Sequence, residues 1–169
     1  MDFSAEFVAL RDRLLEGQDK AFVSRRNVQV AGRMAALLSS FGVDSERKFL
    51  GLMPLGNSSH AHEYRLLFAA PELDEQALED WWVYACEAER ELVKPDASHE
   101  FSIVSLILAT GTVDKAVQKK LKKLTGGRDF SSMGRGWSSV RIAAVGLDEH
   151  KAYTNRMGDA LKNILKPIL

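Results

Sequence analysis

The run FSIVSLILATG, at residues 101–111, constrains the fold more than any other stretch, because nearly all of its residues are apolar or small. A strand with one face in solvent alternates polar and apolar residues, whereas a strand covered on both faces is apolar almost throughout. The run is also far shorter than the roughly 20 residues that a membrane-spanning helix needs. It therefore predicts a central strand whose sheet has other elements packed on both faces.

The segments around this run alternate between strand patterns and helix patterns. Strands that are separated by helices make crossover connections, so this part of the sheet should be parallel. Two neighbouring strands separated by a short polar segment should instead form an antiparallel hairpin. The elements expected after residue 46 are, in chain order, strands at 47–56 and 63–71 joined by a turn at 57–62, a helix at 75–93, the central strand, a helix at 113–124 and a strand at 138–147.

The N-terminal part has the pattern of two helices. Residues 3–17 carry apolar residues at helical spacing, and residues 27–41 repeat that spacing, with Gly42 placed where a helix commonly ends. We therefore expect a helical pair over 1–43, packed on a mixed α/β core over 44–169. With no linker and no internal repeat, a chain of 169 residues predicts a single domain.

The C-terminal segment predicts a helix, because Tyr153, Leu161 and Ile168 lie on one side at helical spacing. Its start has two interpretations. Either the segment is helical from its beginning, or residues 151–155 form a short antiparallel strand after a turn at 147–150 and the helix begins later.

Together these patterns predict a mixed α/β fold, of the α+β type. An N-terminal helical pair should pack on a mixed sheet of about four to five strands, which combines an antiparallel hairpin with parallel crossover units, and a C-terminal helix should follow.

The composition, with 46% hydrophobic and 27% charged residues, is typical of a soluble globular protein. Because 23 basic residues balance 23 acidic ones, no overall charge attracts nucleic acid or an anionic membrane, and an electrostatic partner must be recognised locally. The single cysteine, Cys86, cannot form an intrachain disulfide, which fits a reducing compartment. The N-terminus also lacks a signal-peptide pattern, so we expect a cytoplasmic protein that does not enter membranes.

The charges are segregated along the chain. Residues 71–100 hold ten acidic and two basic residues, a net charge of −8, whereas residues 113–141 hold two acidic and eight basic residues, a net charge of +6. A glycine-rich loop at 125–136 follows the basic helix and could bring backbone amides close to a phosphate. The candidate anion-binding or partner-binding residues are Lys119, Lys120, Lys122, Lys123, Arg128 and Arg135.

Whether this basic stretch is available depends on strand order. If both crossovers run the same way along the sheet, their right-handedness places the acidic and basic helices side by side, where their charges offset each other. If the strand order reverses between them, the helices fall on opposite faces and the basic one is free to meet an acidic protein surface or a nucleic acid.

A histidine cluster offers a different hypothesis. His60 and His62 stand at the entrance to the strand at 63–71, and His99 and Glu100 stand at the entrance to the central strand. If these strands are parallel neighbours, imidazoles and a carboxylate meet at one edge, and these groups are suitable ligands for zinc or a similar divalent ion. HxH is a short pattern, however, and the spacing of the two segments does not fix a site.

Two functional classes follow. We favour a non-catalytic binding or interaction module, acting through the basic helix and the arginine loop and able to form a homodimer. The alternative is a metal-dependent hydrolase or nuclease built on the histidine and glutamate residues. The sequence contains no GxSxG motif and no other nucleophile pattern, which favours the non-catalytic class.

Overall fold

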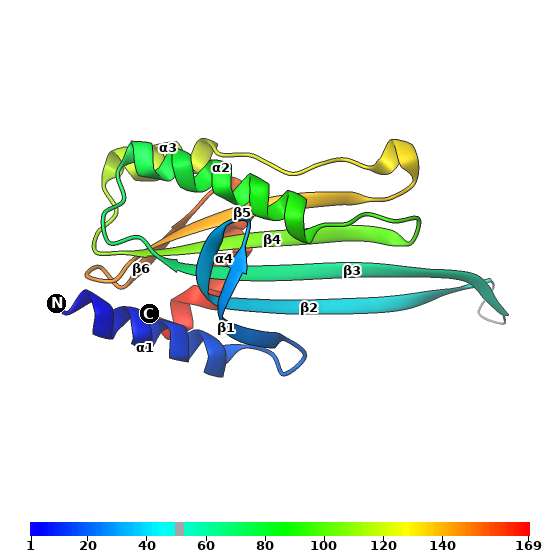
Figure 1. The fold of residues 1–169 in the computed structure, drawn as a ribbon, viewed down its shortest axis with the longest axis horizontal. Helices are drawn as coiled ribbons and strands as arrows, with labels where there is room; N and C mark the ends of the chain where they lie inside the picture. The colour runs from blue at the N-terminus through cyan, green and yellow to red at the C-terminus, as the bar shows by residue number, and fades with distance from the viewer. Residues whose placement is uncertain (50–52) are drawn as a thin grey trace.

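A computed structural model describes residues 1–49 and 53–169, and it describes the side chains of residues 1–44 and 59–169. In these residues the chain forms four α-helices and one six-stranded mixed sheet, which confirms the mixed α/β class (Figure 1). The elements are α1 (Phe3–Gly17), β1 (Val23–Val30), β2 (Arg33–Phe49), β3 (Met53–Ala69), α2 (Glu75–Leu92), β4 (His99–Thr110), α3 (Lys115–Lys123), β5 (Trp137–Gly146), β6 (Lys151–Thr154) and α4 (Asp159–Leu165). Short 3-10 turns lie at Ser131–Met133, Arg156–Gly158 and Lys166–Ile168.

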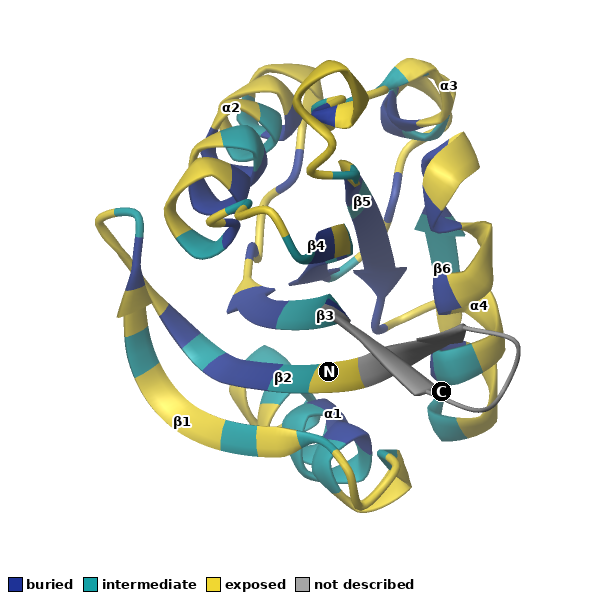
Figure 2. Cartoon of the chain, turned by 90° about the vertical axis from the view of Figure 1, so that its right-hand side faces the viewer, coloured by how far each residue is buried: buried dark blue, intermediate teal, exposed yellow. Residues whose placement is uncertain are grey.

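The strands lie in the sheet in the order of the chain, from β1 to β6. β3, β4 and β5 are parallel neighbours, and the other neighbouring pairs are antiparallel. Both crossovers therefore step in the same direction, and right-handed connections place α2 and α3 on the same face. Figure 2 shows the two helices side by side above the sheet and α1 on the other side.

Each face of the sheet carries its own apolar core. The core under α2 and α3 includes Leu78 and Leu121 from the helices and Leu106 from β4. The core under α1 and α4 includes Leu10 and Leu161, with Ile107 from β4 on the sheet. Consecutive β4 residues thus point into two different cores, which is the physical reason for the apolar run and confirms the central strand.

The two faces are not covered to the same extent. β4 is buried from Val104 to its end, but Phe101 and Ile103 near its start are partly exposed. Phe101 lies six residues before Ile107 and Ile103 lies four residues before it, so all three side chains point to the same face of the sheet. The short helix α4 and the helix α1 cover the carboxyl half of the parallel strands, so no helix of the described residues covers the amino half of this face (Figure 1).

The predicted helix over 27–41 is wrong. These residues form the β1–β2 hairpin, whose turn consists of Ala31 and Gly32, with φ of 47° and 82°. Two positive φ values are the geometry of the tightest hairpin turn. Leu37 and Leu38 are both buried but belong to opposite cores, so β2 shows no alternation of polar and apolar residues and its spacing also fits a helix. The N-terminal part is therefore one helix and a hairpin.

The tip of this hairpin packs against α2, the acidic helix. The Tyr84 hydroxyl donates to the Val30 carbonyl at 2.8 Å, and the Glu91 carboxylate accepts from the Ala31 amide at 2.7 Å. The Arg33 guanidinium lies 4.3 Å from the centre of the Trp81 ring. These contacts replace the helix-to-sheet packing that the sequence predicted for this segment.

The predicted antiparallel hairpin exists, but its strands are longer than expected. β2 and β3 pair through most of their length, and residues 57–62, expected as the turn, lie within β3. The expected strand at 47–56 includes residues 50–52, which lie outside the described residues. The expected division between 1–43 and 44–169 falls inside β2 and is wrong, while the single domain stays a prediction.

The C-terminal segment follows the second of its two interpretations. β6 pairs antiparallel with β5, and α4 begins at Asp159. With β1 and β6 the sheet has six strands, where the sequence predicted about four to five. Within the described residues, no helix combines the length and the apolar character needed to cross a membrane.

Candidate functional site

The four candidate lysines lie on α3, whose apolar residues face the sheet. Lys119, Lys122 and Lys123 are exposed, as the helical pattern predicted. Lys120 forms an ion pair with Glu79 of α2. The acidic helix therefore offsets part of the basic surface, as expected for helices on the same face, and three lysines remain without an ion pair in the part of the chain that the structure describes.

Arg128 is held by α2 and does not project from the loop. Its Nε donates to both oxygens of the Glu89 carboxylate at 2.9 Å, and its guanidinium reaches the Val93 carbonyl at 3.5 Å. Glu89 is only 2% exposed, and a carboxylate buried to this degree requires a cationic or hydrogen-bonded partner. Arg128 therefore neutralises a buried charge and is not free to bind an external anion.

The loop after α3 does not use its glycines as a phosphate cradle. A Cβ on Gly127 would lie 2.3 Å from the Ser138 carbonyl oxygen, and one on Gly136 would lie 1.9 Å from that of Glu100. The amides of Arg128 and Phe130 donate to Ser138 Oγ and to the Gly136 carbonyl, at 2.9 and 2.7 Å. The glycines allow the loop to run close beside the sheet, which corrects the expectation of exposed amides.

Lys122 meets basic residues that the sequence did not group with it. A surface groove of about 250 Å³ is lined by Lys122 of α3 and by Thr154, Arg156, Asp159 and Lys162 of the C-terminal segment. Asp159 pairs with Lys162 at 2.8 Å, and this hydrogen bond, followed by the charge of Lys162, lowers the pKa of Asp159. Two of the three cations in this groove therefore have no carboxylate partner within the described chain.

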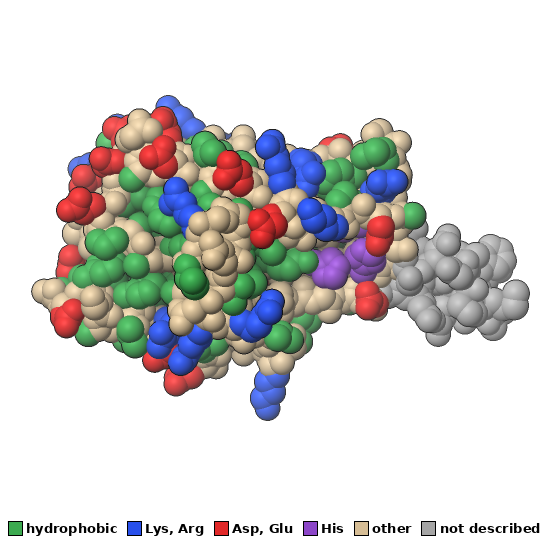
Figure 3. Space-filling view, viewed as in Figure 1, with side chains coloured by type: hydrophobic (Ala, Val, Ile, Leu, Met, Phe, Trp, Pro, Cys, Tyr) green, Lys and Arg blue, Asp and Glu red, His purple; other side chains and the backbone are tan. Residues whose placement is uncertain are grey.

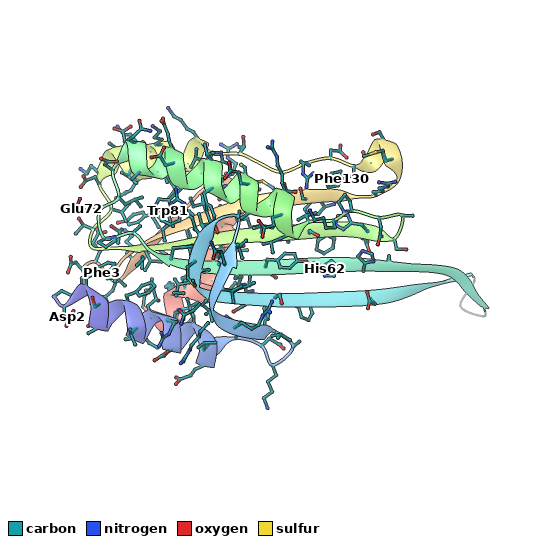
Figure 4. All side chains as sticks on the ribbon, viewed as in Figure 1. Asp2, Phe3, His62, Glu72, Trp81 and Phe130 are labelled. Atoms are coloured by element: carbon teal, nitrogen blue, oxygen red, sulfur yellow. The ribbon has the colours of Figure 1, made fainter. Side chains whose placement is uncertain are left out.

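The histidines do meet at one edge, because β3 and β4 are parallel neighbours and His60 pairs with His99 in the register. The ring of His60 lies 5.1 Å from that of His62 and 5.9 Å from that of His99, between centroids. Figure 3 shows histidine side chains together at the surface, and Figure 4 labels His62 on β3. Burial, and then repulsion from His60 and His99, lower the pKa of His62.

The hydrogen bonds of His99 oppose a metal-binding role. Its Nδ1 must donate to the Arg135 carbonyl at 2.5 Å, because a carbonyl only accepts. Its Nε2 then accepts from the Ser102 hydroxyl at 2.8 Å, so neither nitrogen offers a free electron pair. Among the described residues, no group of three or more His, Cys, Asp or Glu side chains is arranged to hold a metal ion.

Glu100 lines one groove together with His62, but among the described residues it forms no ion pair with an imidazole. The register between β3 and β4 shifts between His60 and Ala61, and the exposed Glu100 lines a groove with Ala61 and Phe101. Arg135 is exposed, and its carbonyl, not its side chain, contacts the cluster. The structure thus brings three of the four candidate metal ligands together without giving them a coordinating geometry.

The groove that Glu100 borders is an apolar depression on the uncovered half of the sheet, and we call it the strand-end groove. It measures about 400 Å³. Two rows of the sheet form its floor: Phe41, Glu63 and Ile103 are neighbours across β2, β3 and β4, and Val43, Ala61 and Phe101 form the next row. The groove is lined by Phe41, Val43, Ala61, His62, Glu63, Glu100, Phe101 and Ile103.

Sequence reasoning missed this groove. It placed Phe41 in a helix and read Phe101 and Ile103 as ordinary core. The available signal was the alternation of Glu100, Phe101, Ser102 and Ile103, which differs from the continuous apolar run after it and indicates a strand start with one uncovered face.

Comparison with protein families matches residues 9–167 to a family described as a domain of unknown function, DUF8052. Neither the curated proteins nor the solved structures contain a match to the chain.

Replacing Arg128 with Gln should lower the free energy of unfolding by about 3 kcal/mol, because the buried Glu89 carboxylate loses its cation. Lys120→Gln is the matched control, since it breaks the more exposed pair with Glu79 and should cost less than about 1 kcal/mol. Urea unfolding followed by circular dichroism measures both. Equal losses would contradict a structural role for the Arg128 pair.

Acid should destabilise the protein through His62. The folded state lowers the pKa of His62 below its ordinary value of 6.5, so protonation favours the unfolded chain. The stabilisation is complete above pH 6.5 and is lost as the pH falls through the lowered pKa. Thermal unfolding at about pH 7.5 and about pH 5.5 should show a smaller difference in His62→Asn than in the wild type.

The exposed His150, at the far end of β5, provides the control for this experiment. Its φ of 49° suits asparagine, so His150→Asn should fold normally and keep the wild-type pH dependence. An unchanged pH dependence in His62→Asn would show that His62 does not carry the acid sensitivity.

Proposed function

We propose a function from the geometry alone, because the chain belongs to the DUF8052 family, whose description assigns no activity. The protein is a non-catalytic binding protein that holds a small amphipathic molecule in the strand-end groove. The observation that carries this proposal is an apolar groove of about 400 Å³ on the half of the sheet that α1 and α4 leave uncovered.

The lining of the groove supports a small ligand. Pockets that bind small molecules measure roughly 300–1,000 Å³ and combine apolar walls with a few polar groups. Phe41, Phe101 and Ile103 provide apolar walls, and Glu63 and Glu100 provide polar ones. Trp137 stacks on Phe101 with ring centroids 5.1 Å apart and is 43% exposed, so it extends the aromatic surface at the rim.

The metal-dependent hydrolase or nuclease receives less support. Its histidines lie together, but His99 uses both ring nitrogens in hydrogen bonds within the protein. A catalytic metal needs ligands with free electron pairs and an open position for water. Metal chemistry therefore requires His99 to give up the Ser102 hydroxyl, whereas binding in the groove leaves both hydrogen bonds of His99 in place.

Val43→Asp should weaken the binding of the neutral dye Nile red by about tenfold, because it places a charge in the apolar groove. Val83→Asp is the matched control, since Val43 and Val83 are both exposed valines, 44% and 58%, and Val83 lies on α2 away from the groove. Dye fluorescence measures both. If the wild type does not bind the dye, or both variants bind it equally, the groove is not the site.

A second candidate function rests on the basic groove at Lys122. Lys122, Arg156 and Lys162 line one depression of about 250 Å³, and a single carboxylate, Asp159, lines it with them. Such a cluster suits an acidic protein surface or a nucleic acid backbone. This observation supports the sequence-based hypothesis of a basic surface that binds anions. In the revised surface, Arg156 and Lys162 take part and Arg128 does not.

The triple variant Lys119→Gln, Lys122→Gln and Lys123→Gln should lose most of its affinity for a single-stranded oligonucleotide. Wild-type binding should weaken steeply with added salt, since each lysine that neutralises a phosphate releases counterions. Fluorescence anisotropy at low and raised salt measures both effects, and Lys20→Gln on the exposed loop before β1 controls for net charge. Salt-independent binding, or equal binding by the triple variant, would reject this second function.

A further inference from the structure

Three buried polar atoms beside the strand-end groove have no hydrogen-bond partner among the protein groups of the described residues. They are the Ser105 hydroxyl, the Ser139 hydroxyl and Arg141 Nε. Ser105 is 0% exposed and Ser139 is 2% exposed. A buried polar group without a partner costs roughly 1–3 kcal/mol, so three such atoms in one place call for a physical explanation.

The three atoms lie together on the face of the groove. Ser105 pairs with Arg141 in the register of β4 and β5, and Ser139 pairs with Ile103, which lines the groove. Ser105 and Ile103 are two residues apart on β4, and Arg141 and Ser139 are two residues apart on β5. All four side chains therefore point to the same face of the sheet. The unpaired atoms therefore lie beneath the surface next to Ile103, on the side of the groove that faces the covered half of the sheet.

On β2 and β3, the polar side chains in the same row of the sheet do have interaction partners. Ser39, which is also buried, receives a hydrogen bond from the Gln18 side chain at 2.9 Å and lies 2.8 Å from the Ser24 hydroxyl. Arg65, between Ser39 and Ser105 in the register, binds the Glu63 carboxylate at 2.9 Å and covers the Phe22 ring at 4.2 Å. Only the β4–β5 end of the row is left incomplete within the described residues.

The charges at this end favour an anion. Glu63, a register neighbour of Ile103, forms an ion pair with Arg65. Arg141 has no ion-pair partner in the described part of the chain, so one positive charge remains uncompensated. Glu100 stands at the outer end of the groove, where a second anionic group would be repelled.

We infer that the ligand of the strand-end groove is a medium-chain monocarboxylic acid, whose carboxylate binds Arg141, Ser105 and Ser139. This inference rests on the proposed function. A carboxylate accepts two parallel hydrogen bonds from a guanidinium and has further electron pairs for two hydroxyls. It thus satisfies all three unpaired donors at once, while the alkyl chain lies on Ile103 and Phe101.

The dimensions fit a chain of this class. Ser105 lies four positions after Phe101 in β4, which corresponds to about 13 Å along a strand. A carboxylate at Ser105 therefore places an alkyl chain of medium length along the apolar floor. The far end of that chain reaches Phe101 and the exposed Trp137.

Isothermal titration with octanoate and with 1-octanol separates the head group from the chain. The wild type should bind octanoate at least about tenfold more tightly than octanol, the factor expected for hydrogen bonds to a charged group. Arg141→Gln should reduce octanoate binding to the level of octanol and leave octanol binding unchanged. Arg25→Gln, an exposed arginine on edge strand β1, removes the same charge elsewhere and should bind both ligands like the wild type.

Ser105→Ala distinguishes recognition from folding. Because the Ser105 hydroxyl has no partner in the protein, its removal should leave the unfolding free energy unchanged or higher, yet weaken octanoate binding severalfold. If octanoate and octanol bind equally and Arg141→Gln changes neither affinity, the carboxylate inference is overturned. The proposed binding function of the groove is then still supported. Binding of neither molecule, together with no Nile red binding, would reject both.

Discussion

The parallel pairing of β3, β4 and β5, with both crossovers stepping the same way, is the constraint on which the rest of the structure depends. Right-handed crossovers then place α2 and α3 on one face and leave the other face to the helices at the chain ends. Those helices, α1 and α4, cover only the carboxyl half of the strands. The strand-end groove is the direct consequence, because the amino half of β4 keeps apolar side chains with no helix above them.

The same arrangement decides how the segregated charges are used. With α2 beside α3, Glu79 meets Lys120, and the buried Glu89 meets Arg128. Some of the charges that are segregated in the sequence therefore form ion pairs between α2 and the segment that follows it. Lys122, which has no ion pair in the described chain, instead lines a groove with Arg156 and Lys162, two cations that lie far away in the sequence.

The histidines illustrate how far sequence patterns reach into the candidate sites. The prediction that the starts of two parallel strands meet was right, because His60 and His99 are register partners. Coordination could not be predicted, since it depends on which groups each ring nitrogen meets. For His99 these groups are the Arg135 carbonyl and the Ser102 hydroxyl, and the first comes from a loop 36 residues away.

By itself, the sequence determined the elements with a single strong pattern: the continuous apolar run of β4, the amphipathic helices α2 and α3 and the crossover connections between strands. It misassigned 27–41, because a strand buried on both faces has no alternation and its spacing imitates a helix. Only the tertiary structure decided which face lacks a covering helix and which buried polar groups lack partners. Both depend on contacts between residues distant in the chain, such as Ser105 with Arg141, and local periodicity carries no information about such contacts.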